Sequence, residues 1–341
     1  MKKWLVIQFK QIGDVILTTH LPREIKRLYP DAEVDFLTFD INRSLLINNP
    51  NIKRVYTVSP KNGIFSTLKS VLIIRKNRYD VILDTQNTPR SMYYILFGGA
   101  KVTVGFEKSK RKKAYAELVK AEGSYAGIRK LNMLKPFDAD FSYDKYDCRA
   151  EVFFTPQDIT SAFLKVTGIG IDMEQPYITM SPTHKKNTRR WKMRHFLDTA
   201  NWLAEEKGFQ VLLTYGPGEK DYITEGMKEY SGYINQKIII APSLTMPEFA
   251  AILSQAKMHI GNDSAPHHLA VSQKTPTFVM IGSSPKSWVH PDEMHTYRNL
   301  GMECQPCGKD TCAISDDIPC LNDLTFEMIK PDLEDFIQKN V

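Results

Sequence analysis

The 341-residue sequence contains no apolar run of the roughly 18 residues that a membrane-spanning helix requires. Its first residues, MKKWLVIQFK, include two lysines directly after Met1, as a signal peptide would. Their apolar run is too short for a signal peptide, however, and no small-residue cleavage site follows. We therefore interpret this stretch as a buried strand and expect a cytoplasmic protein.

Signatures of several functional classes are also missing. No G-x-G-x-x-G follows the first predicted strand, which disfavours a dinucleotide-binding dehydrogenase. We find no helix-turn-helix, zinc-finger or RNA-recognition signature, so we expect no nucleic-acid partner. The net charge is only +6, but it includes basic clusters at residues 108–113 (KSKRKK) and 185–194. Two such clusters favour anionic ligands or an anionic membrane surface.

What the sequence does contain is a regular alternation of short apolar runs and helical patterns. Predicted strands cover residues 5–9, 34–37, 55–58, 81–83 and 102–104, then 177–180, 210–215, 237–240, 258–260 and 277–281. Predicted helices cover residues 15–28, 41–48 and 65–76, then 193–207, 219–230 and 247–255. This alternation predicts an α/β fold with doubly wound parallel sheets. We expect domains at 1–155 and 177–324, a linker at 156–176 and a terminal helix at 325–341.

A compact βαβ unit spans residues 257–283, and its turn should lie at the carboxyl edge of the sheet, where such folds bind ligands. Ser264 opens the helix, and the free amides there suit a phosphate. Asp263 would repel that phosphate unless it faces another part of the ligand, such as a sugar ring. Helix capping by Asp263 and Ser264 is the alternative.

The turn after the first strand contains Gly13 and Asp14. Gly13 permits a tight turn, and Asp14 either caps the next helix or lies free at the same sheet edge. Asp84 and Gln86 should reach that edge too, either as ligand contacts or as turn formers.

Four cysteines near the end, Cys304, Cys307, Cys312 and Cys320, form C-x2-C-x4-C-x7-C. In a cytosolic chain this spacing suggests structural zinc more than disulfides.

Five stretches together resemble glycosyltransferase family 9, the ADP-heptose:lipopolysaccharide heptosyltransferases. They are residues 12–37, 80–86, 189–191, 261–270 and 304–320, and the most specific is the string DSAPHHLA at 263–270. The resemblance implies a GT-B fold, with two Rossmann-like domains facing a cleft, and in such proteins a terminal helix often packs back on the first domain. It also implies inverting, metal-independent transfer of a heptose from ADP-L-glycero-β-D-manno-heptose to the lipopolysaccharide inner core, without a cofactor. The family often shows the cysteine pattern without metal-dependent chemistry.

The resemblance also assigns roles to residues. Asp14 matches the proposed catalytic base. The residues expected to bind the donor nucleotide-sugar are Asp263, Ser264, Ala265, His268, Arg189, Thr183, Lys185 and Glu219. Those expected to bind the acceptor are Gly13, Asp84, Gln86, Lys110 and Arg111. Two positions depart from the family: Ala265 replaces the usual Gly, and Arg189 replaces the usual Lys while keeping the positive charge.

The implied partners are ADP-heptose, an anionic lipopolysaccharide or lipid A precursor, and the inner face of the inner membrane, which the protein would contact peripherally. One alternative is a related GT-B transferase with another nucleotide-sugar or acceptor. Another is a non-catalytic nucleotide-sugar-binding protein, against which the intact Asp14 argues.

Overall fold

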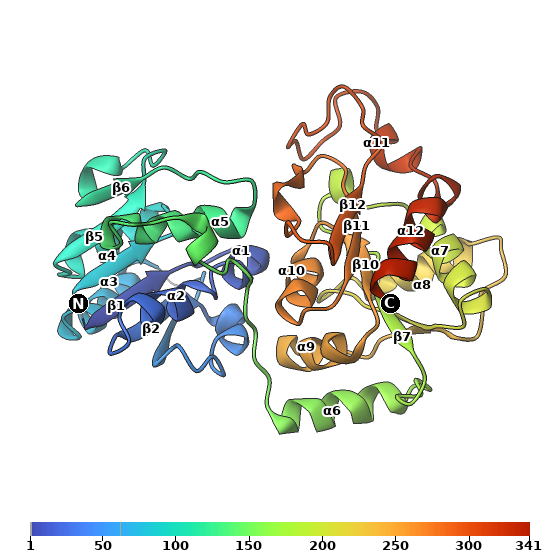
Figure 1. Cartoon of the computed structure of the whole chain (residues 1–341), viewed down its shortest axis with the longest axis horizontal. Helices are drawn as coiled ribbons and strands as arrows, with labels where there is room; N and C mark the ends of the chain where they lie inside the picture. Colours follow the sequence, from blue (N-terminus) through green and yellow to red (C-terminus); the bar gives the residue numbers. More distant parts are fainter. Residues whose placement is uncertain (1, 62) are drawn as a thin grey trace. The chain divides into compact units, whose positions relative to one another are not determined.

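The computed structural model describes residues 2–61 and 63–341, which form two compact units, Met1–Phe153 and Phe154–Val341. Each unit has one parallel six-stranded sheet with helices packed on it (Figure 1). The α/β prediction is therefore confirmed. In the described part of the chain, no helix is both long enough and apolar enough to cross a membrane.

The sheet of the first unit has the order β3-β2-β1-β4-β5-β6. Its strands are β1 (Lys3–Ile7), β2 (Glu33–Phe39), β3 (Arg54–Val58), β4 (Val81–Asp84), β5 (Val102–Phe106) and β6 (Glu117–Val119). Its α-helices are α1 (Ile12–Ile16), α2 (Leu21–Leu28), α3 (Ile64–Lys76), α4 (Pro89–Phe97) and α5 (Ala126–Leu131). Short 3-10 turns complete it: η1 (Asp40–Leu45), η2 (Lys112–Ala114), η3 (Asn132–Phe137) and η4 (Tyr143–Lys145).

The helix predicted over residues 15–28 is in fact two helices, α1 and α2. Pro22 stands in the first turn of α2. A proline there has no amide to donate to the carbonyl of Thr18, and its ring would clash with that carbonyl in a continuous helix. The hydroxyls of Thr18 and Thr19 donate to the carbonyls of Asp14 and Ile16, which satisfies part of the interrupted backbone.

The sheet of the second unit has the order β12-β11-β10-β7-β8-β9. Its strands are β7 (Tyr177–Ser181), β8 (Gln210–Leu213), β9 (Ile238–Ile240), β10 (His259–Asn262), β11 (Thr277–Met280) and β12 (His295–Arg298). Its α-helices are α6 (Pro156–Thr167), α7 (Met193–Glu205), α8 (Lys220–Glu229), α9 (Met246–Gln255), α10 (Ala265–Ser272), α11 (Pro319–Asn322) and α12 (Phe326–Asn340). The 3-10 turns are η5 (Asn187–Arg189) and η6 (Lys286–Trp288).

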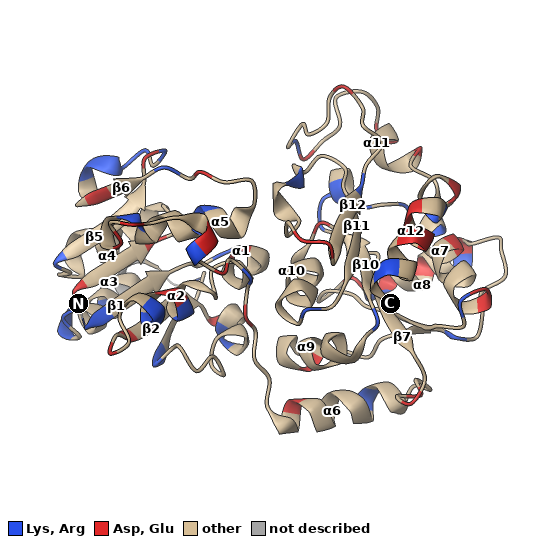
Figure 2. Cartoon of the chain, in the orientation of Figure 1, with Lys and Arg blue, Asp and Glu red and all other residues tan. Residues whose placement is uncertain are grey.

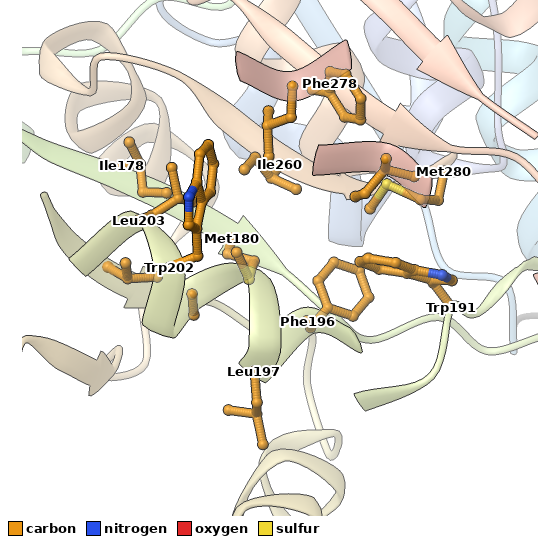
Figure 3. Close-up of a cluster of buried hydrophobic side chains, with 14 of the residues drawn as sticks. Ile178, Met180, Trp191, Phe196, Leu197, Trp202, Leu203, Ile260, Phe278 and Met280 are labelled. Carbon is orange, nitrogen blue, oxygen red and sulfur yellow. The ribbon is translucent and has the colours of Figure 1, made fainter. Parts of the chain in front are cut away.

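A continuous apolar core joins this sheet to α7 (Figure 3). Met180 of β7, Ile260 of β10 and Phe278 of β11 are fully buried, as are Phe196 and Leu203 of α7. Full burial of each such side chain stabilises the fold by about 1.5–3 kcal/mol. The core makes the second sheet a firm support for the loops at its ends.

Two expectations about the chain's organisation need correction. Most of the predicted linker is α6, which lies along α9 in the second unit, with Val166 buried and Lys165 Nζ 2.6 Å from Glu248 Oε1 (Figure 1). The terminal helix was expected to pack against the first domain. Its apolar residues Ile329, Leu333 and Phe336 instead belong to the core of the second unit. Amphipathic periodicity shows that a helix has a face to bury but not which surface covers it.

The edge strands β6 and β12 were not predicted. Both are short: β6 has the three residues ELV, and β12 has the four residues HTYR, which are mostly polar or charged. A short polar edge strand gives almost no periodic signal.

Candidate functional site

Both sheets have a topological switch point at their centre. In each, two neighbouring strands send their connections to opposite sides: β1 and β4 in the first unit, β7 and β10 in the second. Open α/β sheets bind ligands in the crevice outside the carboxyl ends of such strands. The candidate residues after β1, β4, β7 and β10 therefore lie where this fold places its ligands.

In the first unit, Asp14 lies on α1 beside the carboxyl end of β1, with its side chain 29% exposed. The ammonium of Lys130, from α5, is 3.6 Å from Asp14 Oδ1. The same Nζ donates to Gln8 Oε1 at 3.0 Å and to the Thr85 carbonyl at 3.4 Å. Burial lowers the pKa of Lys130, and the Asp14 carboxylate acts in the opposite direction. This arrangement pairs a reachable carboxylate with a buried amine.

Lys130 was not among the site residues predicted from the sequence. A lysine in a short helix normally lies in solvent. Only the packing of α5 brings this one to the ends of β1 and β4.

Asp84 and Gln86 shape this edge rather than face a ligand. Asp84 is fully buried and accepts the amide N–H groups of Gln86 and Asn87 at 3.0 and 2.9 Å and the Tyr115 hydroxyl at 2.7 Å. Gln86 Oε1 accepts the Gln8 side chain and two backbone amides. With these acceptors already occupied, the turn-forming alternative describes both residues better than acceptor contact does.

The remaining acceptor candidates lie in two places. Gly13 is within α1, and its carbonyl accepts the amide of Leu17 at 2.9 Å. Lys110 and Arg111 are exposed on the segment that follows β5, where basic residues cluster near β6 (Figure 2). Because β5 is parallel to β4, this segment leaves the sheet at the same edge as Asp84.

In the second unit, Asn262 at the end of β10 joins the loops of the switch point. Its amide nitrogen donates to the carbonyl of Pro182 at 3.1 Å, and its oxygen accepts the Trp191 amide at 2.8 Å. It thereby holds both ends of the loop that carries Arg189. Asn262 was not among the residues predicted from the sequence, because its partners are distant in the sequence.

The loop brings Arg189 close to Asp263. Arg189 Nη1 is 3.7 Å from Asp263 Oδ2. Burial raises the pKa of Asp263, which is 5% exposed, while the Ser284 hydroxyl and Arg189 act in the opposite direction. Arg189 Nε is buried and has no hydrogen-bond partner among the described residues. The guanidinium therefore retains donor capacity for an anionic ligand.

Ser264 occupies the N-cap position of α10, but its side chain does not cap the helix. Its hydroxyl instead donates to the Asn262 carbonyl at 3.3 Å. The amides of the first turn, which begins at Ala265, are therefore left for another acceptor. His268 on the same helix is buried, which lowers its pKa to about 4 and keeps the ring neutral at pH 7.

The other donor candidates surround this edge. Thr183 is buried in the loop after β7, and Lys185 on that loop is exposed. Glu219 Oε2 accepts the Gly216 amide at 3.1 Å, so it closes the turn that follows β8.

The four C-terminal cysteines are free thiols. Cys304 and Cys307 are exposed, whereas Cys320 is buried, which raises the pKa of its thiol to about 11. Within residues 2–61 and 63–341, no three of these sulfur atoms lie within 4.8 Å of one another. The structure therefore does not gather them into the tetrahedral zinc site that their spacing suggests.

Comparison with known proteins agrees with this geometry. The family model of glycosyltransferase family 9 (heptosyltransferase) matches residues 69–316. Lipopolysaccharide heptosyltransferase 3 of Escherichia coli K12 is 27% identical over 292 residues, in an alignment that covers 82% of this chain and 82% of that one.

Solved structures share the whole fold. A glycosyltransferase family 9 structure from Veillonella parvula superposes with a TM-score of 0.84 at 17% identity, covering 99% of this chain and 98% of that one. The E. coli ADP-heptose lipopolysaccharide heptosyltransferase II gives 0.78 at 18% identity, with 99% of each chain covered. The predicted GT-B fold class is thereby confirmed. Because the family model matches more than half of its residues, this chain belongs to glycosyltransferase family 9, the heptosyltransferase family.

Proposed function

We propose that this protein transfers a heptose from ADP-L-glycero-β-D-manno-heptose to the inner core of lipopolysaccharide, with inversion at the anomeric carbon. Family membership supports this activity, as do relatives named lipopolysaccharide heptosyltransferases. The observation that carries the proposal is the chemistry at the two switch points: a partly buried guanidinium with free donor capacity in one unit and a solvent-accessible carboxylate in the other.

The second unit would hold the donor. Arg189 and the first amides of α10 meet the pyrophosphate, since both favour negative charge. The Asp263 carboxylate, beside Arg189, accepts hydrogen bonds from sugar hydroxyls. Ser264 and Ala265 line the approach of the phosphates to the helix. As the bond from C1 to the phosphate oxygen breaks, ADP leaves with the electron pair, and Arg189 stabilises the growing negative charge.

The first unit would supply the base. The acceptor oxygen forms the new bond to C1 on the face opposite the departing ADP, and its proton passes to the Asp14 carboxylate. Lys130 is a positioning residue. Its contacts to Gln8 and Thr85 hold the ammonium at a fixed place, and the ion pair holds the Asp14 carboxylate there. The pyrophosphate charge is met by Arg189 and helix amides, so the reaction needs neither Mg²⁺ nor another cofactor.

We further propose that the acceptor is an anionic lipopolysaccharide or lipid A precursor and that the protein meets it at the inner face of the inner membrane. Lys110 and Arg111 suit its phosphates. Exposed apolar side chains on the packed pair α3 and α4 support membrane contact: Leu68, Leu72, Ile73, Leu96 and Phe97 are 39–59% exposed. The exposed side chains of Lys69, Arg75 and Lys76 on α3 complement an anionic surface.

A single assay tests the transferase proposal. Purified protein is incubated with ADP-heptose and a panel of truncated lipopolysaccharides, while ADP release and the anomeric configuration of the product are followed. We expect ADP release only with a heptose-deficient inner-core acceptor, and an inverted product. Release with a different nucleotide-sugar would support the related transferase instead. Binding without turnover on any acceptor would support the non-catalytic alternative.

Vesicle sedimentation tests the membrane proposal. Phosphatidylethanolamine vesicles containing phosphatidylglycerol should bind the protein, and those without anionic lipid should bind it weakly. Replacing Leu72 and Phe97 with Ser should release it, whereas Leu164→Ser, at an exposed leucine of α6, should not. Equal binding of the two variants would exclude the α3–α4 face as the contact.

A further inference from the structure

A second group of ligand-type side chains lies in the second unit, away from the switch point. His290 and Asp292 are in the loop before β12, and His295 is its first residue. One ligand atom of each lies within 4.8 Å of the others, and no other such group of three occurs in the described part of the chain. His290 Nδ1 is 3.2 Å from Asp292 Oδ2, and His295 Nε2 is 3.6 Å from Asp292 Oδ1.

These separations match a shared metal ion. Ligands bound tetrahedrally to Zn²⁺ at about 2.0–2.1 Å lie about 3.3 Å from one another. The two measured separations, 3.2 and 3.6 Å, fall on either side of that value, and each histidine approaches a different oxygen of the Asp292 carboxylate. The approach of His295 to Asp292 is too long for a hydrogen bond between those two atoms.

The surroundings hold the group in place. His295 Nδ1 is 3.0 Å from the hydroxyl of Thr277, the residue paired with His295 on β11. Such a bond to the outer nitrogen is what fixes the ring of a metal-binding histidine. The amide of Asp292 donates to the His290 carbonyl at 3.1 Å, and that of Met294 to Asp292 Oδ1 at 3.0 Å. Backbone hydrogen bonds and the Asp292 side chain therefore already form the turn.

We propose that His290, Asp292 and His295 bind one divalent cation of the Zn²⁺ class. Two imidazole nitrogens and one carboxylate suit Zn²⁺ or Co²⁺ better than Mg²⁺ or Ca²⁺, which prefer oxygen ligands throughout. His295 and Thr277 start their strands, whereas Asp263 follows the end of β10. The cation thus lies at the amino edge of the sheet, whereas Asp263 lies at the carboxyl edge. Its role is to fasten the edge strand β12 and its loop, not to assist transfer.

Titration of the full chain, free of any histidine tag and stripped with EDTA, tests this site. We expect one equivalent of Co²⁺ to bind, with the visible bands of nitrogen and oxygen ligation and no sulfur charge transfer. Zn²⁺ should compete and raise the melting temperature. Asp292→Asn keeps the side-chain shape and should weaken metal binding at least about 100-fold. This is more than is lost when a residue that only hydrogen-bonds a metal ligand is removed. Glu293→Gln, an exposed residue of the same turn with the same change in charge, should bind as the natural protein does.

Two further variants remove ambiguity. Replacing Cys304, Cys307 and Cys312 with Ser should leave binding intact. If Asp292→Asn does not fold, His290→Gln takes its place and should show the same loss of binding. Binding that shows sulfur charge transfer, and disappears in the cysteine variant but persists in Asp292→Asn, would overturn the assignment. Absence of binding at millimolar Co²⁺ or Zn²⁺ would overturn it too.

Discussion

Replacing Arg189 with Ala should strongly reduce transfer. Arg189 Nη1 lies 3.7 Å from Asp263 Oδ2. If the guanidinium meets a charged oxygen of the pyrophosphate at about the same separation, the attraction is about 4–5 kcal/mol at an effective dielectric constant of about 20. Part of this attraction is present before the reaction and part is offset by desolvation. We therefore expect about 2–4 kcal/mol of lost transition-state stabilisation, a fall in kcat/KM of about 30- to 1,000-fold.

The assay is steady-state ADP release, together with calorimetric binding of ADP. Arg190→Ala is the matched control in the same loop. The Arg190 guanidinium lies 4.3 Å from the centre of the Tyr222 ring, and its Nη2 donates to Asn187 at 2.6 Å, so its loss should leave kcat/KM nearly unchanged. Arg189→Lys should keep part of the activity, because lysine retains the positive charge but cannot make bidentate hydrogen bonds to a phosphate.

A double variant separates two roles of Arg189. If Arg189 served only to neutralise buried Asp263, then replacing Asp263 with Asn as well would restore the activity lost in Arg189→Ala. We expect no such rescue, because the pyrophosphate would still lack its cation. Rescue by the second substitution, or wild-type kcat/KM in Arg189→Ala, would refute the reasoning.

Four other predictions follow from the same geometry. Asp14→Asn should lower kcat by about 10²-fold or more with ADP affinity retained, the scale for losing a general base; a matching loss of ADP affinity would make Asp14 structural. Lys130→Met should lower kcat by about tenfold, with the donor KM and melting temperature maintained because a buried charge is replaced by an apolar chain of similar length; an unchanged kcat would exclude the positioning role. EDTA should leave turnover unchanged while lowering the melting temperature, and activity that requires added Mg²⁺ would contradict the proposed metal-free transfer. Stability should fall as the pH drops below about 6.5, because burial lowers the folded-state pKa of His259 to about 3 and of His268 to about 4, so the unfolded chain binds more protons. Each histidine should cost about 2 kcal/mol at pH 5, and equal unfolding free energies at pH 7.5 and 5 in denaturant titrations would show the expectation to be wrong.

The sequence alone predicted the parallel α/β architecture, because buried strands and amphipathic helices each leave a local periodic pattern. It also placed Asp14 and Asp263 just after strands, and chain direction alone puts such residues at the carboxyl edge of a parallel sheet. The family followed from the strings around these two residues.

Tertiary structure decided which surfaces and side chains meet. Lys130 reaches Asp14, and Asn262 joins both ends of the Arg189 loop, only because strands distant in sequence are neighbours in a sheet. The same holds for α12, whose apolar face fits the second core, and for Thr277, which orients His295 from the adjacent strand. Local patterns record whether a side chain is buried, whereas the identity of its partner depends on contacts that form only when the whole chain has folded.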